Sequence, residues 1–440
     1  MLTFADTGIR SAPPLPSAAP GGRRRLYLFS PLPPQRNGLA DYIVEYLPML
    51  AADFDLCLVA ESGRAGAAAA HFAGAPFKVM DEAVFLASQP DPGAQILYNV
   101  GNNGDCAYML DHLHRFPGVV VVHDVSLFYL HQVALQLERA NGMFHHAVRD
   151  TGYQVPDDFV ARDGSLGRTP GLLYQECLMV RRIAGAAQGL MLHSRYAEAR
   201  FRGGAFDVPL GVEHKRPLAR IPHFVLPPAP PAPDADQVLQ RFGIEPDDIL
   251  LLVPGFLTGN KMLYEVLVAF WRSHHQHPRL KLLFAGEERA SEYAISDRIR
   301  HLWPDGDGPR VTGYLDAREL DILLTRADLS FVLRYPTYGE TSGILPRAVM
   351  GGGRVVTVDI GSYPEFESPL IDHVSIGSGL VDQLHACIES GCGQLPSPAE
   401  RASRRAVEAQ RAEALSPRAL YPRVRALLDA SWVAAWEAAR

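Results

Sequence analysis

Short, continuous apolar segments recur along the chain, and most lead into a polar or glycine-containing loop followed by a helical segment. In the N-terminal half these segments lie at 26–29, 54–60, 77–80, 95–100, 119–124 and 190–194. In the C-terminal half they lie at 249–256, 280–286, 310–315, 329–333 and 355–359. Apolar strands that alternate with helices are typical of parallel sheets covered on both faces. The pattern therefore predicts an α/β fold with two doubly wound sheets.

A proline-rich segment at 223–234 separates the two halves. Such sequence is stiff and extended, which is typical of a domain linker. The predicted organisation is a disordered lead-in over 1–24, an N-terminal domain over 25–222, a linker over 223–236, a C-terminal domain over 237–415 and a final helix over 416–440. The apolar positions of this last helix share one face, so we expect it to pack across the domains.

Composition narrows the class of protein. The net charge is −7 and the sequence pI is about 6.1, so no global positive field attracts nucleic acid or an anionic membrane. No apolar run approaches the length of a membrane span, and the five cysteines show neither CxxC pairing nor zinc spacing. These features predict a cytoplasmic protein and leave only a peripheral membrane contact open.

The most informative stretch is 333–353, LRYPTYGETSGILPRAVMGGG, which joins a buried strand to a helix. Thr341 or Ser342 is the expected N-cap of this helix. Its N-terminus should open at the carboxyl edge of the sheet, where free N–H groups attract phosphate. The carboxylate of Glu340 would repel that phosphate, so a sugar hydroxyl is its natural partner. The structural alternative is that the hydroxyl merely caps the helix and Glu340 interacts with the helix dipole.

The loops that follow the predicted strands contain a series of polar motifs in a defined order. They are Gly38–Tyr42, Tyr98–Asn102, Pro117–Asp124, His193–Ser194, Gly255–Lys261 and Gly339–Gly343, together with Glu365. From about Arg25 to near the C-terminus, this series resembles the retaining GT-B glycosyltransferases of family four, also called glycosyl transferases group 1. The resemblance implies two Rossmann-like domains facing across a cleft, with acceptor on the N-terminal and nucleotide-sugar on the C-terminal domain.

The resemblance assigns most donor-binding roles to the C-terminal half. Lys261 would neutralise the departing diphosphate, because a fixed cation stabilises negative charge that develops in the transition state. As a merely solvated residue, a lysine at a helix start would be unfavourable. Glu340 would hold hydroxyls of the donor sugar. The other residues expected at the donor are Gly255, Tyr314, Arg334, Thr341, Ser342, Gly343 and Glu365.

Two positions depart from the family's pattern. Phe256 stands where an arginine often follows the glycine, and Arg347 stands near the place of a second glutamate that usually binds ribose. Glu365 or Glu367 could hold the ribose instead, although a surface role is the better interpretation of Glu367. The donor nucleotide is therefore open, with a UDP- or GDP-sugar favoured.

In the N-terminal half, the resemblance implies that His123 contacts the donor sugar near the reacting carbon. Without the resemblance, a histidine at the end of a buried strand is more typical of a satisfied core residue. Asp124 could equally contact the acceptor or cap the following helix. The other residues expected on the acceptor side are Gly38, Asp41, Gly101 and Asn102, while His193 and Ser194 are expected to orient the cleft.

Together these expectations describe a metal-independent, retaining hexosyltransferase with His123, Glu340 and Lys261 as catalytic residues. Its nucleotide-sugar is a co-substrate rather than a resident cofactor, and its acceptor is a hydroxyl of a glycan or glycolipid, as in polysaccharide biosynthesis. The sequence shows no suitably placed metal-ligand motif. Two alternatives stay open, a nucleotide-sugar 2-epimerase and a non-catalytic GT-B scaffold.

Overall fold

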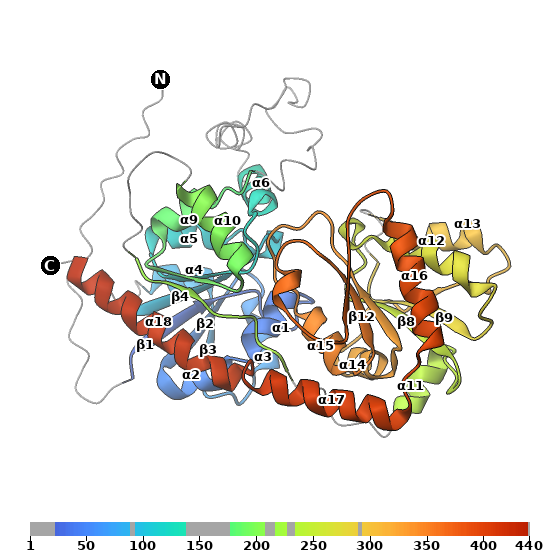
Figure 1. The fold of residues 1–440 in the computed structure, drawn as a ribbon. Coiled ribbons are helices and arrows are strands. Elements are labelled where there is room, and N and C mark those ends of the chain that lie inside the picture. The colour runs from blue at the N-terminus through green and yellow to red at the C-terminus, as the bar shows by residue number, and fades with distance from the viewer. Residues whose placement is uncertain are drawn as a thin grey trace. The chain divides into compact units, whose positions relative to one another are not determined.

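The computed structural model describes residues 23–88, 93–137, 177–206, 216–226, 234–288 and 293–438. Contacts within the chain divide it into two units. The first unit comprises Met1–Pro222, Tyr338–Glu340 and Leu420–Arg440, and the second comprises His223–Thr337 and Thr341–Ala419. Figure 1 traces the chain through the helices and strands of both units.

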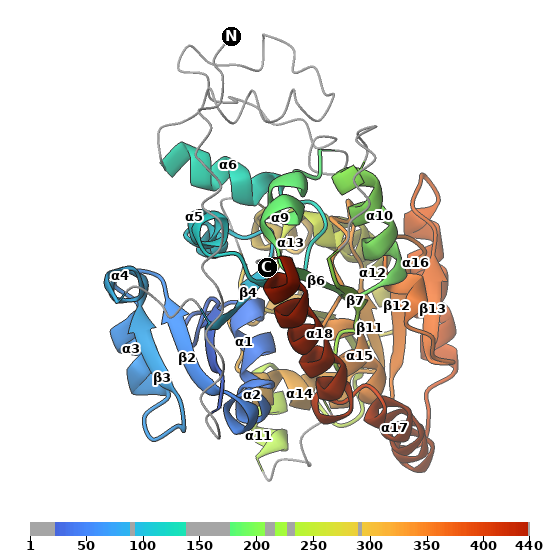
Figure 2. The same cartoon turned by 90° about the vertical axis from the view of Figure 1, so that its left-hand side faces the viewer.

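The first unit is built on a seven-stranded parallel sheet with the order β3-β2-β1-β4-β5-β6-β7. Its strands are β1 (Arg25–Phe29), β2 (Asp55–Ala60), β3 (Lys78–Asp81), β4 (Gln95–Val100), β5 (Val119–Val122), β6 (Gly189–Leu192) and β7 (Leu218–Arg220). The strand order reverses between β1 and β4. Because crossovers between parallel strands are right-handed, this reversal places helices on both faces of the sheet, as Figure 2 shows.

The second unit is built on a six-stranded parallel sheet with the order β10-β9-β8-β11-β12-β13. Its strands are β8 (Ile249–Pro254), β9 (Leu280–Ala285), β10 (Arg310–Val311), β11 (Leu329–Val332), β12 (Arg354–Val358) and β13 (Ile371–Val374). The central strands are apolar along almost their whole length and lie in the core. The prediction of an α/β fold with two doubly wound parallel sheets is therefore confirmed.

The helices connect and cover these strands. In the first unit they are α1 (Gly38–Val44), α2 (Leu47–Asp53), α3 (Ala65–His71), α4 (Glu82–Ala87), α5 (Met109–Arg115), α6 (Phe128–Leu137), α9 (Arg181–Ala186) and α10 (Arg195–Phe206). In the second they are α11 (Ala235–Arg241), α12 (Leu263–His274), α13 (Ile295–Leu302), α14 (Ala317–Arg326), α15 (Ile344–Met350), α16 (Leu380–Gly393) and α17 (Pro398–Glu413). The described residues also form the 3₁₀ helices η1 (Gly104–Cys106), η3 (Gly259–Lys261) and η4 (Tyr363–Glu365), and the last described helix is α18 (Pro417–Ala438).

Local conformation sets several element boundaries. The segment after β1 forms two helices, α1 and α2, and Pro48, which has no N–H to donate, lies in the first turn of α2. Helix α12 begins at Leu263, directly after Met262, which adopts a left-handed conformation with φ of 56°. Helix α11 begins at Ala235, inside the predicted linker. Residues 1–22 of the predicted lead-in and 227–233 of that linker lie outside the described residues.

Helix α18 belongs to the first unit from Leu420 onward. Its Tyr421 hydroxyl donates to Asp53 at 2.8 Å, and the Arg425 guanidinium pairs with the same carboxylate at 2.8 Å. Further along the helix, the carbonyl oxygen of Leu428 accepts from the Gln95 side chain of β4 at 2.5 Å. The C-terminal segment therefore packs against residues from the beginning of the chain.

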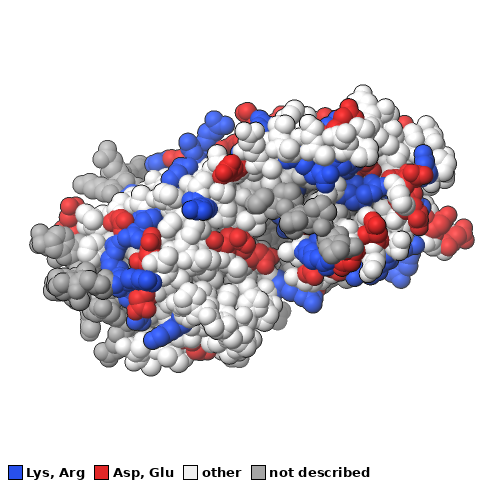
Figure 3. All heavy atoms as spheres, turned by 90° about the horizontal axis from the view of Figure 1, so that it is seen from below, with Lys and Arg blue, Asp and Glu red and all other residues white. Residues whose placement is uncertain are grey.

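Charged side chains of both signs lie mixed on the face that Figure 3 shows. Within the described part of the chain, no helix combines the length and the apolar character that crossing a membrane requires.

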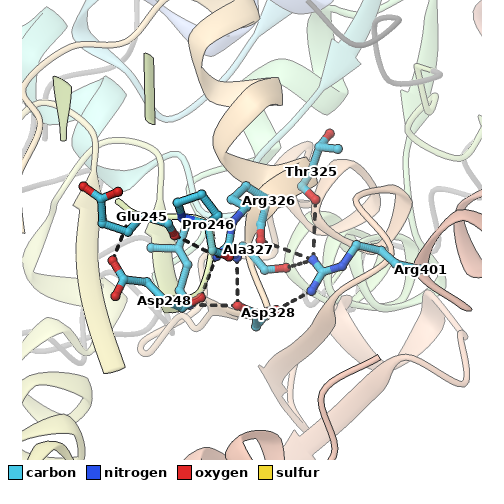
Figure 4. Close-up of polar contacts among 9 residues, drawn as sticks. Glu245, Pro246, Asp248, Thr325, Arg326, Ala327, Asp328 and Arg401 are labelled. Atoms are coloured by element: carbon cyan, nitrogen blue, oxygen red, sulfur yellow. Dashed lines mark hydrogen bonds and ion pairs between the residues drawn. The ribbon is translucent and has the colours of Figure 1, made fainter. Parts of the chain in front are cut away.

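A largely buried carboxylate, that of Asp328, joins three parts of the second unit (Figure 4). Its Oδ2 atom pairs with Arg326 at 3.0 Å and accepts from the Leu250 N–H at 2.8 Å. Its Oδ1 atom pairs with Arg401 of α17, which also donates to the Ala327 carbonyl oxygen at 2.6 Å. Asp328 thus connects the end of α14, the start of β8 and helix α17.

Replacing Asp328 with asparagine should lower the free energy of unfolding of the second unit by about 3 kcal/mol, because two guanidinium groups would lose their buried counter-charge. Chemical denaturation of the wild type and the variant measures this difference. The matched control is Asp382→Asn, since Asp382 pairs with Arg272 while its side chain is 73% exposed. That change should cost less than about 1 kcal/mol. Equal effects of the two substitutions would contradict the role assigned to Asp328.

Candidate functional site

The residues predicted for the site fall into two groups, one in each unit. The first unit contains Gly38, Asp41, Gly101, Asn102, His123, Asp124 and Glu340. The second unit contains Gly255, Lys261, Tyr314, Arg334, Thr341, Ser342, Gly343 and Glu365. The groups are described separately below.

Three predicted acceptor-side residues meet where β4 and β5 end. The Asp124 carboxylate accepts from the Asn102 N–H at 2.7 Å, and a Cβ atom at Gly101 would lie 2.9 Å from the same carboxylate. The Asn102 side chain in turn accepts from the Leu130 N–H in the first turn of α6 at 3.0 Å. Asn102 thus caps one N–H group in the first turn of α6, and the two roles predicted for Asp124 stay predictions.

The other two predicted acceptor-side residues lie in the first turn of α1. Gly38 is its first residue, and the Asn37 side chain caps the helix by accepting from the Leu39 N–H at 2.9 Å. A Cβ atom at Gly38 would meet nothing within 4 Å. Asp41 is exposed. The structure therefore places both residues at an open helix start rather than in a tight loop.

His123 is buried at the end of β5, with 9% of its surface exposed. Its Nε2 atom lies 2.5 Å from the side-chain oxygen of Asn99. The edge of the Tyr42 ring packs against it, and the ring centroid of His193 lies 4.8 Å away. Asn99 and Tyr42 were not among the predicted site residues. Asn99 carries a sequence signal nevertheless, because it is an amide inside a strand where it follows Ile96, Leu97 and Tyr98 and precedes Val100.

The segment Tyr338–Glu340 packs against the residues that follow His123. The Ser126 N–H donates to the Tyr338 carbonyl oxygen at 2.9 Å, and a Cβ atom at Gly339 would lie 1.9 Å from Val125. Gly339 also has φ of 78°, so only glycine fits here without strain. Glu340 is 8% exposed, and its carboxylate accepts from the Tyr338 N–H at 2.6 Å. Glu340 is thereby placed in the same unit as His123.

In the second unit, Lys261 reaches back over the end of β8. Its ammonium group donates to the Pro254 carbonyl oxygen at 2.7 Å, and a Cβ atom at Gly255 would lie 2.7 Å from Nζ. The side chain is half-buried, and the protein atoms that crowd its ammonium group lower the pKa of Lys261 well below its ordinary value. The like charge of Arg334 lowers it further. Among the described residues, Lys261 forms no ion pair with a carboxylate.

Thr341 or Ser342 was the predicted N-cap of α15, and the structure places the N-cap one residue after Ser342. The N-cap is Gly343, and Ser342 accepts from the Leu345 N–H at 3.1 Å, so its hydroxyl does hold the helix end. The hydroxyl of Thr341 is buried and has no hydrogen-bond partner in the described parts of the chain. His223, expected only as a linker residue, lies against Gly343, since a Cβ atom there would be 3.3 Å from its ring.

The remaining positions occupy other parts of the second unit. Tyr314 is exposed after β10, and Glu365 is half-buried in η4. Arg347 pairs with Asp321 at 2.6 Å and donates to the Ala317 carbonyl oxygen at 3.1 Å. The place of the missing second glutamate thus holds an ion pair between α15 and α14. Within the described ranges, no group of His, Cys, Asp or Glu residues is arranged to hold a metal ion.

Solved structures of glycosyltransferases share this fold. HepE of Anabaena, solved with UDP and glucose, has a TM-score of 0.55 and 12% identity over 92% of this chain and 100% of its own. A glycosyltransferase of Rickettsia africae has a TM-score of 0.60 and 10% identity, and the match covers 92% of this chain and 98% of that protein. Sucrose-phosphate synthase of Thermosynechococcus elongatus has a TM-score of 0.59 and 14% identity, and the match covers 94% of this chain and 100% of the synthase chain. No protein-family model and no curated protein matches the sequence. The chain therefore has the GT-B fold, as its sequence predicts.

Lys261→Met should raise the unfolding temperature at neutral pH by about 2–4 °C, or about 1 kcal/mol. The unfolded chain holds the lysine proton more tightly than the folded chain does, so this group makes the fold less stable as the pH falls below its ordinary pKa of 10.5. Methionine removes that penalty, and its advantage should shrink as the pH rises towards 10.5. Calorimetry across this pH range measures both effects.

The control for this prediction is Lys281→Met, the same change at an exposed position on β9. It should leave the unfolding temperature unchanged. If Lys261→Met were the more destabilising of the two at neutral pH, the ammonium group of Lys261 would be a stabilising part of the fold.

Proposed function

We propose that this protein is a retaining glycosyltransferase, which transfers a sugar from a nucleotide diphosphate-sugar to a hydroxyl of a glycan or glycolipid. The observation that carries the proposal is the half-buried ammonium group of Lys261 beside Arg334. Two neighbouring cations lower the stability of the empty protein and attract an anion. A nucleoside diphosphate is the anion that fits a glycosyltransferase fold.

The carboxyl edge of the second sheet offers further groups for that diphosphate. The Gly255 backbone has φ of 87° and turns directly beside Lys261. The Thr341 hydroxyl, buried without a partner among the described residues, would gain one from a phosphate oxygen. Ser342 and Gly343 would contribute backbone N–H groups. HepE was solved with UDP, with UDP and glucose, and with UDP-glucose, which favours a UDP-sugar as the donor here.

In the proposed reaction, the bond between the anomeric carbon and the diphosphate oxygen breaks while the acceptor oxygen bonds to the same face of that carbon. The acceptor proton passes to the departing phosphate oxygen, so no protein nucleophile is consumed. Lys261 stabilises the charge that develops on this oxygen. Glu340 and His123 position the sugar, so that the reaction proceeds from a favourable geometry. The enzyme would act in the cytoplasm, free or at a membrane surface, and without a metal.

The first test is titration calorimetry with UDP and GDP at neutral pH. We expect UDP to bind, and we expect Lys261→Met to weaken binding at least tenfold while Lys281→Met leaves it unchanged. Because an anion favours the charged lysine, affinity should fall as the pH rises through the lowered pKa of Lys261. Failure of both nucleotides to bind would favour the non-catalytic scaffold, for which the Arg347–Asp321 ion pair is the supporting observation.

The product pattern then separates the two enzyme classes. With the donor that binds, NMR should show a transferred sugar whose anomeric configuration matches that of the donor. Inversion of this configuration would overturn the retaining mechanism. Release of free nucleoside diphosphate together with a sugar altered at C2, without any acceptor, would instead identify a 2-epimerase.

A further inference from the structure

Asn99 is fully buried near the end of β4, with no exposed surface, and it contacts three separate segments. Its side-chain oxygen faces His123 of β5. Its side-chain nitrogen donates to the Leu39 carbonyl oxygen in α1 at 3.1 Å and to the Ser30 hydroxyl after β1 at 3.0 Å. One amide therefore joins the histidine to two segments at the same edge of the sheet.

The direction of each hydrogen bond in this group is fixed by chemistry. A backbone carbonyl only accepts, so the group that faces Leu39 must be the NH₂ of Asn99. The Ser30 hydroxyl donates to the Pro31 carbonyl oxygen at 2.7 Å, and it can accept from Asn99 at the same time. The orientation of the amide is thus determined by its partners, although oxygen and nitrogen have similar shapes. The side-chain oxygen is left for His123.

This orientation determines which nitrogen of His123 carries a proton. An amide oxygen only accepts, so the Nε2 atom 2.5 Å away must donate. The neutral ring then carries its hydrogen on Nε2, and Nδ1 has the lone pair. Protonation of His123 takes place at Nδ1, because Nε2 is already protonated.

We propose that Asn99 is a positioning residue that holds His123 in the Nε2–H tautomer and fixes the orientation of its ring. The tautomer follows from the described contacts of Asn99. That this tautomer serves the binding of a donor sugar rests on the proposed function. Because the same amide holds the Leu39 carbonyl oxygen, Asn99 also fixes the first turn of α1, where Gly38 and Asp41 lie.

Other titratable groups lie on the elements that pack around the histidine. They are Tyr42 of α1 and Tyr46 after it, His193 after β6, Asp124 next in the chain, and Glu340 on the segment that packs against Val125 and Ser126. A test of Asn99 must leave all of these unchanged. Substitution of the amide by the isosteric carboxylate, Asn99→Asp, replaces none of these groups, and it removes only the NH₂ that donates to Ser30 and Leu39.

The experiment is nitrogen NMR of the full chain with ¹⁵N-labelled histidine, with the His123 signals identified from their absence in His123→Gln. In the wild type, we expect the nitrogen shifts of a neutral ring protonated at Nε2. A ring protonated at Nδ1 would overturn the proposal without any further variant. In Asn99→Asp, the carboxylate should stabilise the imidazolium and move the titration of His123 upward by about 1–2 pH units.

The matched control is Asn103→Asp, the same substitution at a residue whose side chain caps η1 by accepting from the Asp105 N–H. Aspartate caps equally well, so the titration of His123 should stay in place. Equal titration of His123 in the two variants would overturn the proposal. UDP binding tests the proposed function separately from the role of Asn99. The proposed UDP affinity depends on Lys261, so it should be the same in Asn99→Asp as in the wild type.

Discussion

Parallel strands place all their carboxyl ends at one edge of a sheet, and the positions of the site residues depend on this constraint. In the first unit, Asn99 lies near the end of β4, while His123 and His193 follow β5 and β6. These strands are adjacent in the sheet, so residues far apart in sequence come within hydrogen-bond or ring contact. In the second unit, Gly255 and Arg334 follow the adjacent strands β8 and β11 in the same way. In each unit, the parallel sheet therefore brings the polar residues at its strand ends close together.

Sequence patterns predicted the parts of the fold that depend on local hydrophobicity. Both parallel sheets were predicted, because buried strands and covering helices repeat along the chain. The site residues at strand ends were identified from their place in these repeats and from a family resemblance. The contacts of Asn99 and His223 were not predicted, since their partners Leu39 and Gly343 are distant in sequence. The left-handed Met262 that delays α12 has no sequence signal either, because glycine or asparagine is the usual residue there.

The anion-binding role proposed for Lys261 would oppose the stability of the fold. In the described parts of the chain the Lys261 ammonium group is crowded and donates to one carbonyl oxygen, so it carries a charge that the fold does not fully compensate. An exposed lysine would cost nothing, but water would screen its charge and weaken its attraction for a phosphate. The neighbouring Arg334 increases both the cost and the attraction. A strong electrostatic contribution to binding therefore requires a destabilised empty site, which is a common exchange at functional positions.

Arg347 forms an ion pair at the position where the family resemblance implied a second glutamate. Its side chain pairs with Asp321 and with the Ala317 carbonyl oxygen, so it joins α15 to the first turns of α14. A glutamate at this position would face the Asp321 carboxylate, and the like charges would repel each other. The replacement of the expected glutamate by Arg347 thus involves two positions, because Asp321 supplies the complementary charge. Arg347 therefore serves as a connection between two helices of the second unit. The proposed function rests on Lys261 and Arg334 and not on a carboxylate at position 347.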